Sequence, residues 1–221
     1  MIRFVPLRRR VRDSIARFTR DARATVLIEM AFAIPFLVLV GFGGLEIANL
    51  TLTQTRISQI GLNAADNASR IAAGSNLAQP QVRETDINEV FAGVETQAGN
   101  LDFKTHGRII LSSLERNDDG GQWIHWQRCY GDLDVESSYG EAGDGEEGTD
   151  FPGMGFEGAE VTAAAGTAVM FVEIYYDYQP LLYGKVVGQR RMHSTAAFNI
   201  REARDLTQVY NPSSVAVSNC D

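Results

Sequence analysis

The longest pattern along the chain is an apolar stretch near its start. Residues 26–50 carry no charge apart from Glu29 and Glu46. About 20 apolar residues are enough for a helix to cross the hydrocarbon core of a bilayer. A secretory signal has a shorter apolar core and ends at a small-residue cleavage site, and no such site follows here. The pattern therefore predicts a transmembrane segment at about residues 26–50.

The helical pattern continues beyond this segment. Apolar residues recur at spacings of three and four, which is typical of one face of a helix. They are Ile57, Ile60, Ala64, Ala68, Ile71 and Ala72. No proline interrupts residues 36–73, and Gly-Ser-Asn at 74–76 supplies a stop signal. We therefore predict one helix over residues 25–73, with a transmembrane first half and an amphipathic second half.

Shorter patterns in the remainder predict an α+β domain over residues 74–221. An approximate apolar stripe at residues 82–99 predicts a second helix. Four runs rich in β-branched and aromatic residues predict a small, mostly antiparallel sheet, and a turn cluster at 117–121 joins the first two as a hairpin. These runs are residues 109–111, 123–126, 168–178 and 191–200.

Residues 131–160 form a loop of different composition. Glycine and acidic residues dominate it, and it contains no Lys or Arg. Such a composition predicts a solvated surface loop. Calcium bound by Asp132, Asp134 and the carboxylates of residues 144–150 is the alternative, because Ca²⁺ prefers oxygen ligands. Their spacing does not match an EF-hand, so we predict no metal site.

Charge is divided between the two sides of the apolar stretch. Residues 1–23 contain eight arginines and two acids, whereas the rest of the chain has 12 basic and 26 acidic residues. Positive flanks stay in the cytoplasm, so residues 1–24 are predicted to be a basic cytoplasmic leader and the C-terminal part is predicted to be exported. A nucleic-acid-binding arm is the alternative, but an acidic domain argues against nucleic acid.

Glu29 is the most unusual residue of the apolar stretch. An ionised carboxylate at that depth costs several kcal/mol, so it is a candidate functional residue; an acid that reaches back to the interface is the alternative. Gly41, Gly43 and Gly44 make one side of the helix thin, which favours close helix packing. Ordinary tolerance of glycine in a membrane helix is the alternative.

Residues able to carry out chemistry are few. Cys129 and Cys220 are an even number of cysteines, which permits a disulfide outside the cytoplasm; two unpaired thiols are the alternative. His125 lies four residues before Cys129, but its tryptophan neighbours favour packing over a nucleophile and base. No metalloprotease, serine-hydrolase or phosphate-loop motif is present. We therefore expect neither an enzyme nor a cofactor.

The start of the apolar stretch resembles a known processing signal. A basic leader and the small residue Ala24 precede the sequence TVLIE at 25–29 and then an apolar helix with the pattern P-x-L. This order resembles the TadE/TadG-like proteins of the tight-adherence (Flp, type IVb) pilus system, which are pseudopilin-like. The sequence VEIYYDYQPL at 172–181 is similar to a second segment of that family. The family's usual glycine before the cut is Ala24 here.

The resemblance implies a pilin-like outline and a role as a minor pilin or pseudopilin in pilus assembly, adhesion and surface attachment. Prepilin peptidase would cut between Ala24 and Thr25, and the new amine would pair with Glu29 of a neighbouring subunit. Partners would be pilin-like subunits and the tight-adherence secretion platform. The helix would lie in the bacterial inner membrane with its C-terminal domain in the periplasm. A single-pass protein with a periplasmic binding or adhesive domain outside any filament is the alternative.

Overall fold

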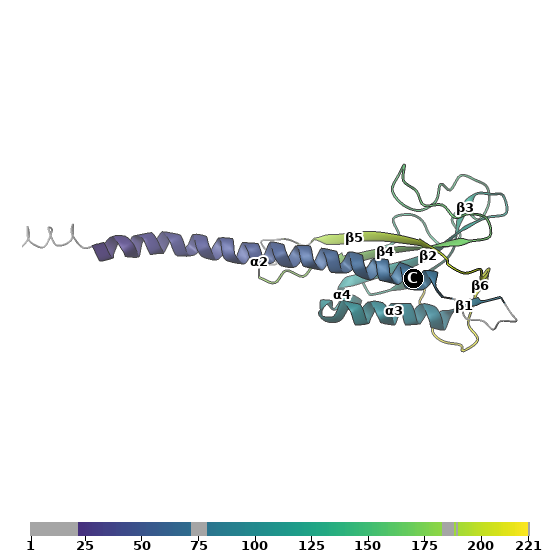
Figure 1. The fold of residues 1–221 in the computed structure, drawn as a ribbon, viewed down its shortest axis with the longest axis horizontal. Coiled ribbons are helices and arrows are strands. Elements are labelled where there is room, and N and C mark those ends of the chain that lie inside the picture. Colours follow the sequence, from purple (N-terminus) through teal and green to yellow (C-terminus); the bar gives the residue numbers. More distant parts are fainter. Residues whose placement is uncertain (1–21, 72–78, 183–187, 189, 221) are drawn as a thin grey trace, which may run out of the picture. The chain divides into compact units, whose positions relative to one another are not determined.

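The structure is a computed structural model that describes residues 22–71, 79–182, 188 and 190–220. Most of the predicted leader, residues 1–21, therefore lies outside the described residues. The chain divides into two compact units, Met1–Ala48 and Asn49–Asp221. The second unit is a mixed helix and sheet domain, which we call the head. The α+β fold class predicted from the sequence is thus confirmed (Figure 1).

Helix α2 spans Ala22–Ser69, so it ends before the predicted residue 73. The end is set by residues from the far end of the chain. The Arg204 guanidinium donates to the carbonyl oxygens of Ala68 (3.2 Å) and Ile71 (2.9 Å), and the Arg201 amide donates to that of Ser69 (3.3 Å). The last carbonyls of a helix lack partners within it, and these donors satisfy them at a point that sequence spacing does not mark.

Four strands form an antiparallel sheet in the order β3-β2-β4-β5. They are β2 (Gly107–Arg116), β3 (Gln122–Tyr130), β4 (Ala168–Asp177) and β5 (Arg191–Asn199). The predicted hairpin is confirmed as β2 and β3. Its turn is closed by Asn117, whose backbone amide donates to the Gly121 carbonyl (3.0 Å) and whose side-chain oxygen accepts from the Gly121 amide (2.7 Å).

The second helix, α3, spans Glu84–Ala98, two residues shorter at its start than predicted. Residues Gln81–Arg83 instead form β1, which pairs in parallel with β6 (Asp205–Tyr210), a strand that the sequence did not predict. The boundary is set by Asp86, whose carboxylate reaches back from the third helical position and accepts from the Arg83 amide (3.2 Å). After α3 come a short 3₁₀ turn, η1 (Gly99–Leu101), and α4 (Phe103–His106).

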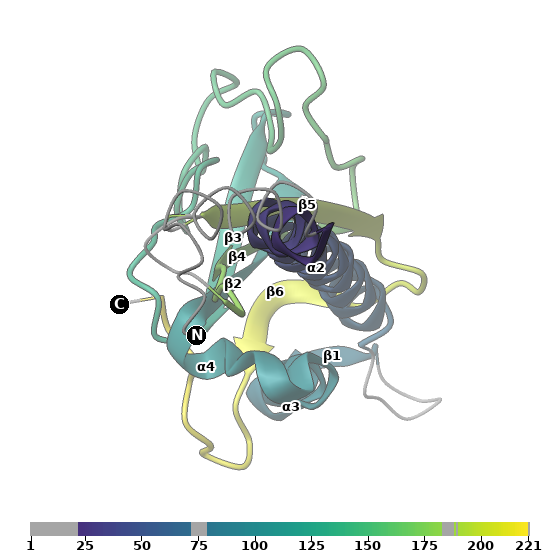
Figure 2. The same cartoon turned by 90° about the vertical axis from the view of Figure 1, so that its left-hand side faces the viewer.

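One face of the sheet packs against both helices of the head and forms the main core. The apolar stripe of α2 from Asn49 onward and that of α3 meet the inward residues of β2 and β4 there (Figure 2). A Cβ at Gly61 of α2 would lie 3.1 Å from Ile174 of β4, so this glycine permits the close approach of helix and sheet. The core residues include Ile57, Ile60, Ile87, Phe91, Ile109, Leu111, Val172, Ile174 and Tyr176.

The other face of the sheet is covered by the acidic loop, so the prediction of a solvated loop is only half right. Its acidic residues are largely exposed, but Tyr139 and Met154 pack against Phe171 of β4 in a second apolar cluster. The loop also extends the hairpin edge, where the Ile124 amide donates to the Asp144 carbonyl (2.9 Å). Single apolar residues spaced among glycines have no period that a sequence pattern can register.

Candidate functional site: the exposed apolar segment of helix α2

Every side chain from residue 25 to residue 45 is exposed. Phe32 is 78% exposed, and Leu27 and Leu39 are each 71% exposed. Soluble monomers rarely expose so large a continuous apolar surface. This one helix near the N-terminus is long and apolar enough to cross a membrane. Residues 26–45 alone would span about 30 Å as a helix, which matches the hydrocarbon core of a bilayer.

Glu29 lies one turn after Thr25 on this helix, and its side chain is exposed. Residues four apart share one helix face, so a carboxylate and an N-terminal amine at these two positions would point to the same side. The predicted processing bond, between Ala24 and Thr25, lies within the first turns of α2. The structure therefore places the processing residues and the predicted pairing acid on one short stretch of helix.

The three glycines predicted to pack helices lie in open space. Apart from the backbone of the helix itself, a Cβ at Gly41, Gly43 or Gly44 would meet no heavy atom of the described residues within 4 Å. At about 100° per residue, Glu29 and these glycines fall within an arc of about 160° around the helix. The acid and the thinnest part of the helix therefore face the same half of the surroundings, which is the arrangement that a helix-packing face requires.

Cys129 and Cys220 form a disulfide in the head, with their Cα atoms 4.8 Å apart. Hydrogen bonds from β3 and α3 hold the C-terminal tail just before the bridge. The Cys129 amide donates to the Ser218 carbonyl (2.8 Å), and the Asn88 side chain of α3 donates to the Ala216 carbonyl (2.9 Å). The bridge excludes Cys129 as a free nucleophile beside His125, whose Nδ1 instead lies 3.1 Å from the Glu115 carboxylate.

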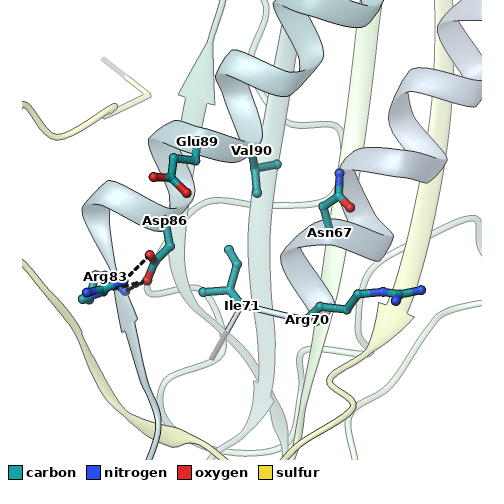
Figure 3. A pocket seen from close by; sticks show the side chains of 7 residues that line it. All are labelled: Asn67, Arg70, Ile71, Arg83, Asp86, Glu89 and Val90. Carbon is teal, nitrogen blue, oxygen red and sulfur yellow. Dashed lines mark hydrogen bonds and ion pairs between the residues drawn. The ribbon is translucent and has the colours of Figure 1, made fainter. Parts of the chain in front are cut away.

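A pocket of about 380 Å³ lies between the end of α2 and the start of α3 (Figure 3). The Arg83 guanidinium that lines it is bonded to the Asp86 carboxylate, while the Arg70 side chain points away from the α3 residues. None of the lining residues is a histidine, cysteine or serine, so the pocket holds no Ser–His or Cys–His pair. The lining residues are Asn67, Arg70, Ile71, Arg83, Asp86, Glu89 and Val90.

A buried polar cluster, which sequence reasoning missed, lies under the acidic loop. The Glu173 carboxylate is fully buried and accepts hydrogen bonds from the Ser137 hydroxyl, the Ser138 amide (2.9 Å) and the Tyr175 hydroxyl (2.8 Å). His193 stacks on the Tyr175 ring with the centroids 4.3 Å apart. The signal in the sequence was an acid in the middle of the apolar strand of residues 168–178, whose only other acid is Asp177 near its end. Because the carboxylate is satisfied by donors of the loop, the cluster fastens the loop to the sheet.

We expect this cluster to make stability depend on pH. Burial lowers the pKa of His193, and the nearby Glu173 carboxylate, 3.9 Å from Nε2, only partly offsets the effect. Above the unfolded pKa of about 6.5, His193 is neutral in both states and its protonation does not lower the free energy of unfolding. As the pH falls from there through the lower folded pKa, the unfolded chain binds the proton more readily than the folded head, so the free energy of unfolding decreases. For one proton, this decrease is at most about 1.4 kcal/mol per pH unit.

The comparison is between the protein and His193→Phe, which keeps a ring against Tyr175 but cannot titrate. Urea unfolding of both proteins between about pH 8 and pH 5 measures the difference in their free energies of unfolding. This difference is expected to shift in favour of the variant as the pH falls below about 6.5. A difference that stays constant across this range would contradict the assignment.

The described residues show no group of three or more His, Cys, Asp or Glu side chains that could hold a metal ion. Comparison with known proteins gives this chain no relative: no family model, no curated protein and no solved structure matches it.

Proposed function

We propose that this chain is a pilin-like subunit, anchored in the bacterial inner membrane, that takes part in assembling a tight-adherence type IV pilus. The observation that supports the proposal most is an exposed apolar helix segment with an acid one turn from its start, joined to a folded α+β head. The resemblance of residues 20–37 and 172–181 to motifs of TadE/TadG-like proteins is the reason for proposing this pilus system. The chain acts by association and not by catalysis.

Pairing within the membrane would drive the association. Once the leader is removed, the amine of Thr25 and the carboxylate of Glu29 are two charges that lipid disfavours separately. In a neighbouring subunit each finds its counter-charge, and two isolated ions become one pair. A buried polar contact of this kind fixes the axial register between helices, as a single polar position does in a coiled coil. Gly44, on the same half of the helix as Glu29, lets the neighbour approach closely.

Two further features support export of the head. The basic residues lie before the apolar segment and the acidic head follows it, which is the positive-inside arrangement. The head also carries the Cys129–Cys220 bridge, and disulfides persist in oxidising compartments such as the periplasm. Together they support a topology with the leader in the cytoplasm and the head in the periplasm.

N-terminal sequencing of the protein extracted from bacterial membranes tests the proposal. Thr25 is expected as the first residue. In Ala24→Leu, which replaces the small residue before the cut with a bulky one, the leader is expected to remain attached. A native protein that keeps its arginine-rich leader contradicts the proposal and favours a single-pass protein whose head binds or adheres outside a filament.

Replacing Glu29 by alanine is expected to leave cleavage intact and to weaken subunit association by about 1–2 kcal/mol, or roughly tenfold, which is the range for polar contacts between membrane helices. The fraction of processed protein recovered in sheared pili measures the effect. Leu27→Ala is the matched control, because Leu27 is exposed on nearly the opposite side of the helix. Equal recovery of the Glu29 variant and the parent protein would exclude the pairing role.

A further inference from the structure

The head has one end that is tied directly to the incoming helix. Asn49 is the first residue of the head, and its side-chain nitrogen donates to the Tyr178 hydroxyl (2.7 Å). Tyr178 directly follows β4, which ends at Asp177. The connection from β4 to β5 therefore starts beside the point where the chain leaves the apolar segment. We call this end of the head, with residues 178–182 at its centre, the base.

Two leucines are exposed at the base. Leu181 is 64% exposed and Leu182 is 42% exposed, immediately after Pro180. A residue adds at most about 3.6 Å to the reach of an extended chain, so Leu181 lies within roughly 11 Å of Tyr178. These are large apolar side chains held, by a short covalent tether, close to the entry of the helix. Water is a poor environment for such a pair.

The length of chain between the apolar segment and the head limits how far the base can lie from the lipid. If residues 26–45 fill the hydrocarbon core, Asn49 is only four residues further along the chain, so it stays within about 14 Å of the edge of the core even if the chain is extended. The polar headgroup region covers about the first 5–8 Å of that distance. The base is therefore within reach of the layer between lipid tails and water, where partly buried apolar side chains are stable.

Charge separates the base from the other end of the sheet. The turn between β2 and β3 carries Asp118 and Asp119, and the acidic loop is fastened there because the Asn117 side chain donates to the carbonyls of Gly145 and Gly148. At the base, exposed Lys104, Arg190 and Arg191 accompany exposed Asp102, Asp132 and Asp134. The charges at the base therefore balance, and the base lacks the excess of acid found near the turn, so anionic lipids would repel it less than the other end.

We propose that Leu181 and Leu182 insert into the headgroup layer of the bilayer that holds α2, and that they seat the head on the membrane surface. The proposal rests on the membrane anchor of the proposed function. It identifies the partner of the base as lipid and not protein. Seating would restrict the orientations of the head around its entry point, and it would hold the acidic end of the sheet away from the lipid.

Tryptophan fluorescence of the full-length protein in lipid nanodiscs tests this proposal. Three single variants are compared, and the emission of native Trp123 and Trp126 in the parent protein is subtracted. The sites have matched exposure: Leu181 (64%) at the base, Phe156 (65%) in the acidic loop, and Leu37 (65%) in the apolar segment. Lipids brominated near the headgroup quench an indole at the interface, and lipids brominated along the tails quench one in the core.

The new indole in Leu181→Trp is expected to lose about half of its emission with the headgroup-proximal bromines, because tryptophan is favoured at that depth. Leu37→Trp is expected to be quenched by the tail bromines, and Phe156→Trp by neither lipid. Quenching at position 37 without quenching at 181 overturns the seating proposal alone. Loss of quenching at position 37 overturns the anchor as well. Quenching of Phe156→Trp to the same extent as Leu181→Trp would show that the head contacts lipid with its acidic loop as often as with its base, which also overturns the proposal.

Discussion

Replacing Cys129 and Cys220 together by alanine is expected to lower the free energy of unfolding of the head by about 4–5 kcal/mol. The bridge joins residues 91 positions apart, and a cross-link that closes so long a loop removes much conformational entropy from the unfolded chain. In the folded head, removing the bridge is expected to change only the contacts close to it. The tail would keep the Ser218 carbonyl on the Cys129 amide and the Arg108 guanidinium on the Cys220 carbonyl (2.6 Å).

The measurement is urea unfolding of the purified full-length protein in detergent, followed by tryptophan fluorescence. Trp123 and Trp126 lie on β3 with Cys129, so they report on the strand to which the tail is fastened. Asn88→Ala is the control, because it removes two hydrogen bonds to the tail, those with Ala216 and Ser218, and leaves the bridge intact. A loss below about 1 kcal/mol in the double variant would mean that the bridge does not constrain the unfolded chain.

Replacing Glu84 by alanine is expected to cost about 3–5 kcal/mol of stability, because it leaves a buried charge without a partner. Glu84 is the first residue of α3 and is 2% exposed. Its carboxylate accepts from the Arg128 Nε of β3 at 3.1 and 3.0 Å, and from Nη2. The Arg128 guanidinium also lies 6.0 Å from the centre of the Trp126 ring. The pair therefore joins helix and sheet at one end of the core.

The first turn of α3 provides a matched control. Asp86 is also paired with an arginine, but the Arg83 side chain is 40% exposed, against 16% for Arg128. Asp86→Ala removes a cap and a solvated pair and is expected to cost about 0.5–2 kcal/mol. The double variant Glu84→Met/Arg128→Leu is expected to regain most of the loss, because apolar residues replace both buried charges. If Glu84→Ala costs no more than Asp86→Ala, burial does not govern the strength of this pair.

Long periodic segments were the part of the fold that the sequence predicted well. The strand predicted at residues 168–178 is β4, Ala168–Asp177, because its β-branched and aromatic residues suit a sheet that is buried on both faces. The second half of α2 followed from the spacing of residues such as Ile57 and Ile60, which form part of the core. In both segments the local pattern and the tertiary packing favour the same structure.

Elements defined by contacts between distant residues were the part that the sequence could not predict. The three residues of β1 are too few to show a period, and they form a strand only because β6 pairs with them. The end of α2 depends on Arg204, which is 3% exposed and 136 positions from Ala68. The acidic loop packs through isolated side chains such as Tyr139. Each of these contacts requires a partner that no local pattern identifies.

The candidate site shows the same division. The apolar segment and the positions of Glu29 and the glycines on a helix followed directly from the sequence, because composition alone determines such a segment. Their position within one arc of the helix surface follows from the helical repeat of about 100° per residue. The Glu84–Arg128 pair and the donors around Glu173 were not predictable, since acids and arginines are usually solvated and only the fold brings these together.

The contacts that complete the head span nearly its whole length, and this determines how late in synthesis the head can close. Tyr178 meets Asn49, Arg204 closes the end of α2 and Ser218 bonds to Asn88, across 129, 136 and 130 positions. Contacts between such distant residues form only after the intervening chain is available. If the head is exported as proposed, both of its helices reach the far side of the membrane before the residues that fasten them. The emerging polypeptide would then stay open until its last few dozen residues have been translocated, and that interval is when it would be most exposed to proteases and to aggregation.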